Sequence, residues 1–153
     1  MRWQYRDPVL VWLVVAAFAA HVVEEYLASF PGWFAQLSGR PLPVAAFLWI
    51  NGVALPAIVV ITWAGLRRGW DWIPIALGTI VLVNGVGHLL GSLATGTYSP
   101  GLLTGIMLYL PLGQLLLIRA WHQASGTTLA TGILSGIVAH MGVTLTAVAV
   151  SLR

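Results

Sequence analysis

Apolar residues dominate the chain in five long runs, which short polar or glycine-containing segments separate. A helix that crosses a membrane needs about 20 mostly apolar residues, because each residue adds ~1.5 Å across a hydrocarbon core of ~30 Å. All five runs reach this length. The predicted spanning helices cover residues 8–30, 44–66, 72–94, 101–121 and 127–152. The pattern therefore predicts an all-α fold, an integral membrane bundle of five transmembrane helices.

The connections between the runs are short and rich in turn-forming residues. Each contains glycine, and several add proline or serine, as in FPGWFAQLSGRPLP, RRGWD, TGTYSPG and HQASG. None is long enough to separate two domains, so residues 1–153 are predicted to form a single transmembrane helical domain. The basic N-terminal start leads into an apolar run without a small-residue cleavage site, so we expect a retained helix rather than a signal peptide.

The arginines are distributed unevenly between the two ends of the predicted helices. Those on the side of the N-terminus are Arg2, Arg6, Arg67, Arg68 and Arg119, and those on the other side are Arg40 and Arg153. Cytoplasmic loops carry the excess of basic residues in membrane proteins. The sequence therefore predicts an N-terminus in the cytoplasm and a C-terminus outside, in the cytoplasmic (plasma) membrane.

The composition agrees with this class and narrows the chemistry. The chain is 59% hydrophobic and 7% charged, whereas soluble domains are about 25% charged. The basic residues stand singly or in pairs between apolar runs, so we do not expect a nucleic-acid partner. There is no cysteine, which excludes disulfides and thiolate-held metals. Any metal must be held by histidine, carboxylate, amide or water.

The stretch FAAHVVEEYLAS places His21, Glu24 and Glu25 within the first predicted helix. A helix that stopped before Glu24 would have only about 16 residues, too few to cross a membrane. An unpaired charge at that depth costs at least ~2.5–3.5 kcal/mol, and no basic residue lies in the core of any predicted span. A metal ion or protonated histidines would supply the missing charge. The alternative is a helix end from which both glutamates reach the outer interface.

Polar residues of the other helices fall at nearly the same depth. Counted at ~1.5 Å per residue, His21, His88 and His140 lie ~18–24 Å from the cytoplasmic face. Asn51 and Tyr109 lie ~12–14 Å below the outer surface by the same count. In a core of ~30 Å these two depths nearly coincide. The sequence therefore predicts one intramembrane layer of polar side chains.

These residues suit a metal site of iron or zinc, with one or two ions. Two histidines with one carboxylate form the facial triad of non-haem iron, and histidine-rich sets with a spare glutamate suit hydrolytic zinc. The predicted metal ligands are His21, Glu24, Glu25, His88 and His140. Glu25 is also a candidate general base, and Tyr109 a candidate hydrogen-bond or proton donor. Asn51 and Asn84 are predicted to orient the ligands by hydrogen bonds.

A family resemblance rests on three motifs. His21-Val22-Val23-Glu24-Glu25 resembles the signature of the HXXEE family of small membrane proteins, and NGVGH at 84–88 and TYSPGLLTG at 97–105 also resemble that family's pattern. The likeness covers nearly the whole chain. It implies a multi-helix membrane fold in which His21, Glu24 and Glu25 act as one unit. It implies no reaction, because the function of the family is unknown.

Four functions are compatible with these observations. The preferred one is a membrane metalloenzyme, an oxidoreductase or a hydrolase, that acts on a lipid-like substrate such as an acyl chain, an isoprenoid or a sterol-like molecule. Paired histidines could instead bind haem b for electron transfer, but the glutamates would then have no role. A carrier of protons or divalent metals would use a His/Glu relay and would require a homo-oligomer. The fourth is a structural or partner-binding subunit.

Overall fold

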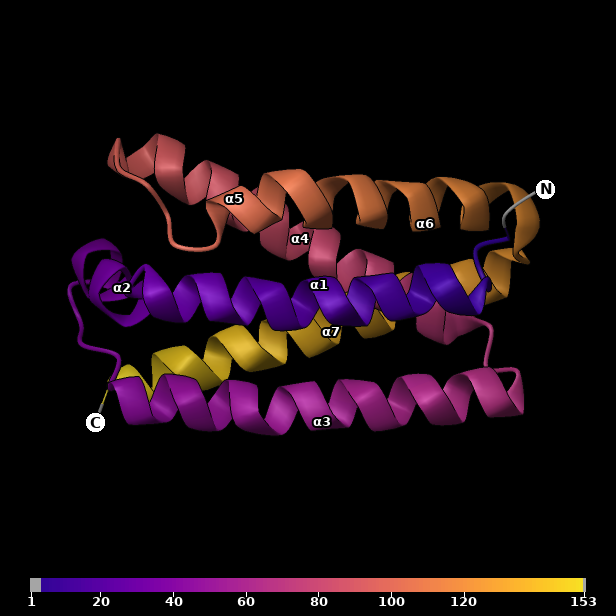
Figure 1. The fold of residues 1–153 in the computed structure, drawn as a ribbon, viewed down its shortest axis with the longest axis horizontal. Coiled ribbons are helices and arrows are strands. Elements are labelled where there is room, and N and C mark those ends of the chain that lie inside the picture. Colours follow the sequence, from indigo (N-terminus) through magenta and orange to yellow (C-terminus); the bar gives the residue numbers. More distant parts are fainter. Residues whose placement is uncertain (1–3, 153) are drawn as a thin grey trace.

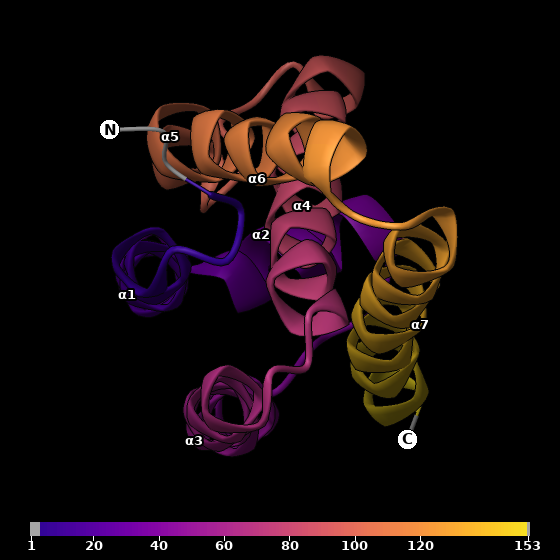
Figure 2. The same ribbon diagram turned by 90° about the vertical axis from the view of Figure 1, so that its right-hand side faces the viewer.

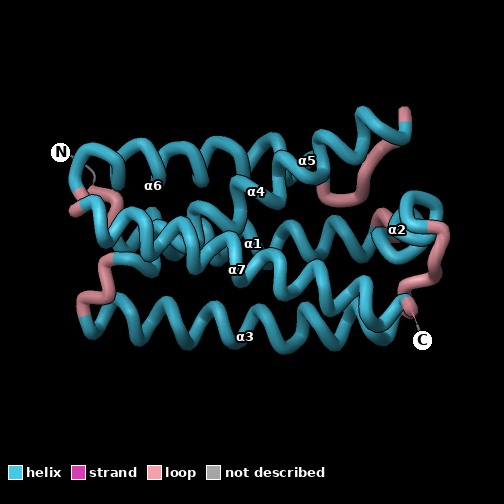
Figure 3. Tube along the Cα trace, turned by 180° about the vertical axis from the view of Figure 1, so that it is seen from behind, coloured by secondary structure: helices cyan, strands magenta, loops and turns pink. Residues whose placement is uncertain are grey.

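The computed structural model describes residues 4–152, and helices make up nearly all of that length (Figures 1 and 3). No strand occurs among these residues. Five of their helical segments are long and apolar enough to cross a membrane. They are α1 (Pro8–Leu27), α3 (Val44–Arg68), α4 (Trp72–Thr95), the continuous run Leu102–Gln123, and α7 (Gly126–Ser151). The all-helical fold, with five helices long and apolar enough to cross a membrane, is confirmed for the described residues.

The orientation of the termini stays a prediction. Arg2 and Arg153, which the arginine count uses, lie outside the described residues.

The first boundary differs from its prediction. The helix α1 ends at Leu27 instead of continuing to residue 30, and Ser29 adopts a left-handed backbone with φ of 59°. A separate short helix, α2 (Phe30–Ser38), then occupies what we predicted as a loop. Pro31 lies in the first turn of α2. Backbone N–H groups in the first turn have no partner within the helix, so a proline, which lacks this group, is tolerated there. A proline that looks like the end of one helix therefore begins the next.

The fourth span is not a uniform α-helix. It begins with α5 (Leu102–Thr104), continues through the π-helical turn η1 (Gly105–Tyr109), and ends with α6 (Leu110–Gln123). Pro111 follows the wide turn, and a proline cannot donate the backbone hydrogen bond that a regular α-helix requires of it. Single π turns inside helices occur frequently at functional sites. This one carries Tyr109.

The helix α4 lies at the centre of the bundle, and the other spanning segments surround it (Figure 2). It contacts α1, α3, α6 and α7, and its most extensive partner is α7. The apolar core forms where α1, α4 and α6 meet, around Val11, Val14, Ile75, Val81 and Leu116. The helices α3 and α7 keep most of their surface exposed, as helices that face lipid do.

Two glycines allow α7 to lie close against α4. Gly132 and Gly136 form a G-x-x-x-G pair on one face of α7, the small-residue pattern that lets membrane helices approach. A Cβ atom at Gly132 would lie 2.5 Å from Cβ of Ile75, and one at Gly136 would lie 2.7 Å from the carbonyl oxygen of Ala76. The backbone of α7 therefore touches α4 directly.

We expect Gly136→Ala to lower the free energy of unfolding by about 1–3 kcal/mol, because the added methyl overpacks the α4–α7 contact. The measurement is unfolding in mixed detergent micelles, followed by tryptophan fluorescence. The matched control is Gly142→Ala on the same helix, since no atom lies within 4 Å of a Cβ placed there. Equal stabilities of the two variants would contradict the close packing of α4 and α7.

Candidate metal centre

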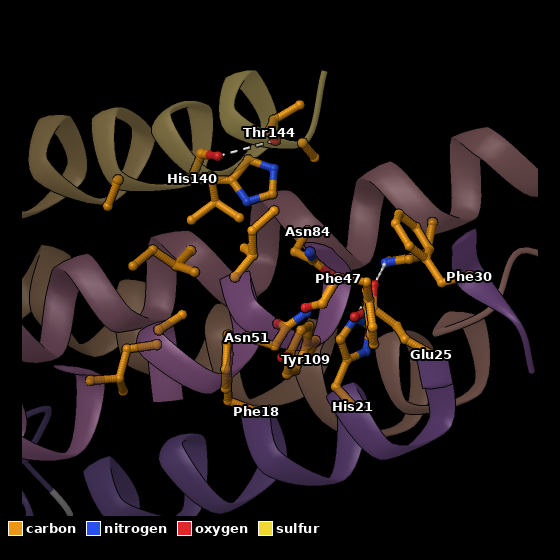
Figure 4. Close-up of a pocket in the computed structure, with 18 of the residues that line it drawn as sticks. Phe18, His21, Glu25, Phe30, Phe47, Asn51, Asn84, Tyr109, His140 and Thr144 are labelled. Carbon is orange, nitrogen blue, oxygen red and sulfur yellow. Dashed lines mark hydrogen bonds and ion pairs between the residues drawn. The ribbon is translucent and has the colours of Figure 1, made fainter. Parts of the chain in front are cut away.

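Three side chains from α1 and α4 converge inside the bundle: His21, Glu25 and His88 (Figure 4). All three are buried, and one nitrogen of each ring and one carboxylate oxygen lie within 4.8 Å of one another. Oε1 of Glu25 lies 3.5 Å from Nε2 of His21 and 3.4 Å from Nε2 of His88. Two ligands held tetrahedrally at the usual ~2.0–2.1 Å from one metal ion are about 3.3 Å apart. This group could hold a metal ion.

Hydroxyl groups from the segment between α4 and η1 hold the other nitrogen of each ring. Oγ1 of Thr104 lies 2.7 Å from Nδ1 of His21, and Oγ of Ser99 lies 2.9 Å from Nδ1 of His88. When the Thr104 hydroxyl donates to the carbonyl of Gly101, 3.4 Å away, its oxygen accepts the proton of His21 Nδ1. In that tautomer the lone pair of His21 Nε2 points toward Glu25. Partners of this kind orient metal-binding histidines.

No arginine or lysine forms an ion pair with this cluster within the described residues. The ion partners of Glu25 within residues 4–152 are the two histidines, which are charged only when they are protonated. Nε2 of His21 has no hydrogen-bond partner there. A buried carboxylate close to two imidazole nitrogens is unfavourable unless a cation or protons lie between them.

The neighbouring Glu24 has a different role in the structure. Its carboxylate accepts hydrogen bonds from the hydroxyl of Tyr98 and from the backbone N–H groups of Gly101 (3.1 Å), Leu103 (3.0 Å) and Thr104 (2.7 Å). Partial burial and the nearby Glu24 raise the pKa of Tyr98 above its ordinary value, so the hydroxyl stays protonated and can donate. Glu24 does not join the three-residue group. It anchors the segment that supplies Ser99 and Thr104.

The backbone of Gly101 lies directly against both imidazoles. Its φ is 101°, a conformation that side chains other than hydrogen disfavour. A Cβ atom there would lie 2.6 Å from Cε1 of His21 and 2.8 Å from Cε1 of His88. Glycine is therefore required at this position both by its backbone angle and by the space that the rings occupy.

Tyr109 lies on the other side of His21. The two rings are stacked with 4.3 Å between their centroids, and the tyrosine is only 1% exposed. Its hydroxyl has no hydrogen-bond partner among residues 4–152. Sequence reasoning selected Tyr109 as a donor, and its position next to a candidate ligand suits that role.

The structure keeps the remaining predicted residues apart from the ligands. His140 lies on α7, across a cavity from His21 (Figure 4), and is not part of the three-residue group. Nδ2 of Asn51 donates to the carbonyl of Phe47 at 3.0 Å, and Oδ1 of Asn84 is buried without a partner in the described chain. Within residues 4–152, neither Asn51 nor Asn84 forms a hydrogen bond with His21 or His88.

Sequence reasoning missed Ser99, Gly101 and Thr104 as parts of the site. They lie in a turn and a helix start, where serine, glycine and threonine are ordinary residues. The available signal was the resemblance of TYSPGLLTG to a family motif, because that motif contains all three residues.

A cavity of about 330 Å³ borders all three candidate ligands and Tyr109. Its opposite walls are the inner faces of α3 and α7, where it meets Asn51, His140 and Thr144 (Figure 4). Most of the other lining side chains are apolar. The candidate metal centre is therefore open to a largely apolar space inside the bundle.

Comparison with curated proteins and with solved structures gives no match. A family model described as "Protein of unknown function with HXXEE motif" matches residues 12–116. The matched range includes the three candidate ligands together with Ser99, Thr104 and Tyr109, and it ends before His140. Because the match covers more than half of the chain, the protein belongs to the HXXEE-motif family.

Proposed function

We propose that this protein is a metal-dependent enzyme of the membrane interior, in which His21, Glu25 and His88 bind one iron or zinc ion and the substrate is lipid-like. The observation that carries the proposal is the convergence of two imidazole nitrogens on one buried carboxylate oxygen at 3.4 and 3.5 Å. No arginine or lysine accompanies these groups among the ion pairs of the described residues.

Three protein ligands are typical of a catalytic site, because structural zinc sites use four. When bound, iron or zinc would act as a Lewis acid or activate an oxygen ligand at an open position. Two histidines and one carboxylate serve both non-haem iron oxygenases and zinc hydrolases, so oxidation and hydrolysis both fit this donor set. The adjoining cavity gives the open side of the ligand group room for a substrate.

Tyr109 supplies a hydrogen-bond donor beside the ligands. Its hydroxyl is buried and has no protein partner in residues 4–152, and Tyr109 is one of the residues that line the cavity. A preorganised donor in a site of low polarity stabilises negative charge that develops on a substrate oxygen. We assign Tyr109 this role, and Glu25 the role of ligand.

One ion fits the arrangement better than two. The Glu24 carboxylate already accepts four hydrogen bonds from the 98–104 segment, and His140 lies across the cavity. The geometry also argues against haem between His21 and His88. Their ring centroids are 4.8 Å apart and Glu25 contacts both rings, which leaves no space for a porphyrin between them.

Removal of a ligand should remove the metal. Protein purified in detergent without chelator is expected to contain about one iron or zinc ion per chain, and His21→Ala or His88→Ala is expected to lose it. Inductively coupled plasma mass spectrometry, combined with a measurement of protein concentration, gives the number of metal ions per chain. His140→Ala and the exposed His122→Ala should keep the metal. Loss in His140→Ala would restore that residue as a ligand, and wild-type protein without stoichiometric metal would refute the centre.

Disturbing the hydroxyl partner of His21 should weaken metal binding without abolishing it. Thr104→Val removes the group that orients the ring, so we expect a loss of about 10–100-fold in metal affinity. Competition with a chromophoric chelator measures the affinity. Thr146→Val is the matched control, because Thr146 is exposed on α7 and its hydroxyl donates only to the backbone carbonyl of Gly142. Equal affinities for both variants would contradict the assigned role of Thr104.

Catalysis on lipid predicts a chemical difference in the membrane. In cells that carry this chain naturally, His21→Ala at the same protein level is expected to deplete one lipid species and accumulate its precursor. Lipid mass spectrometry detects the pair, and their mass difference distinguishes hydrolysis from oxidation. Identical lipid profiles for wild type and variant would count against a lipid substrate.

A further inference from the structure

The cavity beside the candidate centre is long and narrow. Its lining on α3 extends from Phe47 to Ile61, which are 14 residues apart and therefore about 21 Å along a helix axis. The volume is about 330 Å³, at the lower end of the range for ligand pockets. A small volume spread over that length makes a channel that runs parallel to the helices, instead of a rounded chamber.

Polar groups are concentrated in one part of the walls that α1, α3 and α4 contribute to this channel, and α7 adds His140 and Thr144 to the opposite wall. Between Asn51 and Ile61, α3 contributes only apolar lining over about 15 Å. Lining residues from other helices continue that apolar part at Phe18 on α1 and Ile80 on α4. The candidate ligands, Tyr109 and Asn84 lie beyond it, toward the end of the bundle that carries α2. On the walls from α1, α3 and α4, the channel therefore has a polar section followed by a hydrocarbon section.

Two buried polar atoms in the polar section lack partners among the described residues. They are the hydroxyl oxygen of Tyr109, which can donate, and Oδ1 of Asn84, which can only accept. Buried polar groups are nearly always hydrogen-bonded. A ligand whose end carries a hydroxyl group or a protonated carboxyl group would accept from Tyr109 and donate to Asn84.

The channel opens sideways between α3 and α7, which lie on the same side of α4 (Figure 2). Ala57 and Ile61 on α3 and Ala139 and Val143 on α7 line the channel and are also exposed. The aromatic pairs Phe30–Phe34 and Phe30–Phe47, with ring centroids 6.0 Å apart, lie at the α2 end. A ligand would therefore enter from the hydrocarbon region, with its chain along α3.

The geometry points to a single-chain lipid as the ligand, an acyl chain that ends in a hydroxyl or carboxyl group. Its oxygen-bearing end lies beside His21, Glu25, His88 and Tyr109, and its tail lies along α3 toward Ile61. This inference rests on the proposed function, because it names the substrate class of that same centre. It selects a linear chain over a fused-ring molecule, because a ring system needs width rather than length.

The test uses the metal-loaded protein in lipid nanodiscs and two photoreactive palmitic acid analogues. One carries a diazirine near its carboxyl group and the other near the end of its tail. Peptide mass spectrometry maps the labelled residues. The first probe is expected to label the neighbourhood of Asn84 and His88, and the second that of Phe18, Ile58 and Ile61. Excess palmitic acid should suppress both, and a reversed pattern would overturn the assigned direction of the chain.

Ala54→Phe is expected to abolish labelling by the tail probe, because the ring fills the hydrocarbon section beside the polar one. The position borders the cavity, so the larger side chain has space without disturbing the fold. Ala45→Phe is the matched control on the same helix, since Ala45 is exposed and does not line the channel. Tyr109→Phe should weaken competition by palmitic acid up to about tenfold, through loss of one hydrogen bond.

Metal content measured on the same samples separates this inference from the proposed function. Bound metal without labelling of channel residues overturns the chain ligand and leaves the metal centre intact. Labelling that Ala54→Phe abolishes, in protein that binds no metal, supports the chain site and overturns the proposed enzyme. A photoreactive sterol that labels the channel where the palmitic acid probes do not would overturn the linear-chain assignment.

Discussion

A buried carboxylate between two imidazoles is the constraint on which the rest of this structure depends. Glu25 is buried in the last turn of a helix that has the length and composition of a membrane span, and its ion partners in the described chain are His21 and His88. Nothing in a hydrocarbon layer can solvate such a group. The surrounding helices must therefore present donors and a place for a cation. The central position of α4, which carries His88, brings the second imidazole to Glu25.

The two adjacent glutamates have different roles. Glu25 faces the imidazoles, while Glu24 binds the start of the fourth span through a hydroxyl and three backbone amides. That binding fixes Ser99 and Thr104, whose hydroxyls hold the outer nitrogens of the same imidazoles. One glutamate thus contacts the candidate centre and the other secures the segment that supports it. A single turn of α1 connects the two functions.

The sequence was sufficient for the five long apolar helices, because the rise of a helix is fixed and a membrane has a known thickness. Depth says nothing about rotation around a helix axis. His140 lies across the cavity from the three-residue group, and Glu24 differs from Glu25 by about 100° of helix rotation. Ser99 lies in a connection and Thr104 at the start of a helix. The hydrophobic pattern of the sequence does not predict the path of the backbone in such segments. Pro31 lies in the first turn of α2, although a proline is also common just after the end of a helix.

The wide turn of η1 has a consequence for angular register. Each residue of an α-helix advances the side-chain direction by about 100°, and a π turn absorbs one extra residue without changing the axis. Before the turn, the chain must aim Thr104 at His21; after it, α6 must aim Leu116 into the core against α4. An unbroken α-helix would couple these two directions rigidly. The extra residue lets the support of the histidine and the packing of the bundle be satisfied independently on one continuous span.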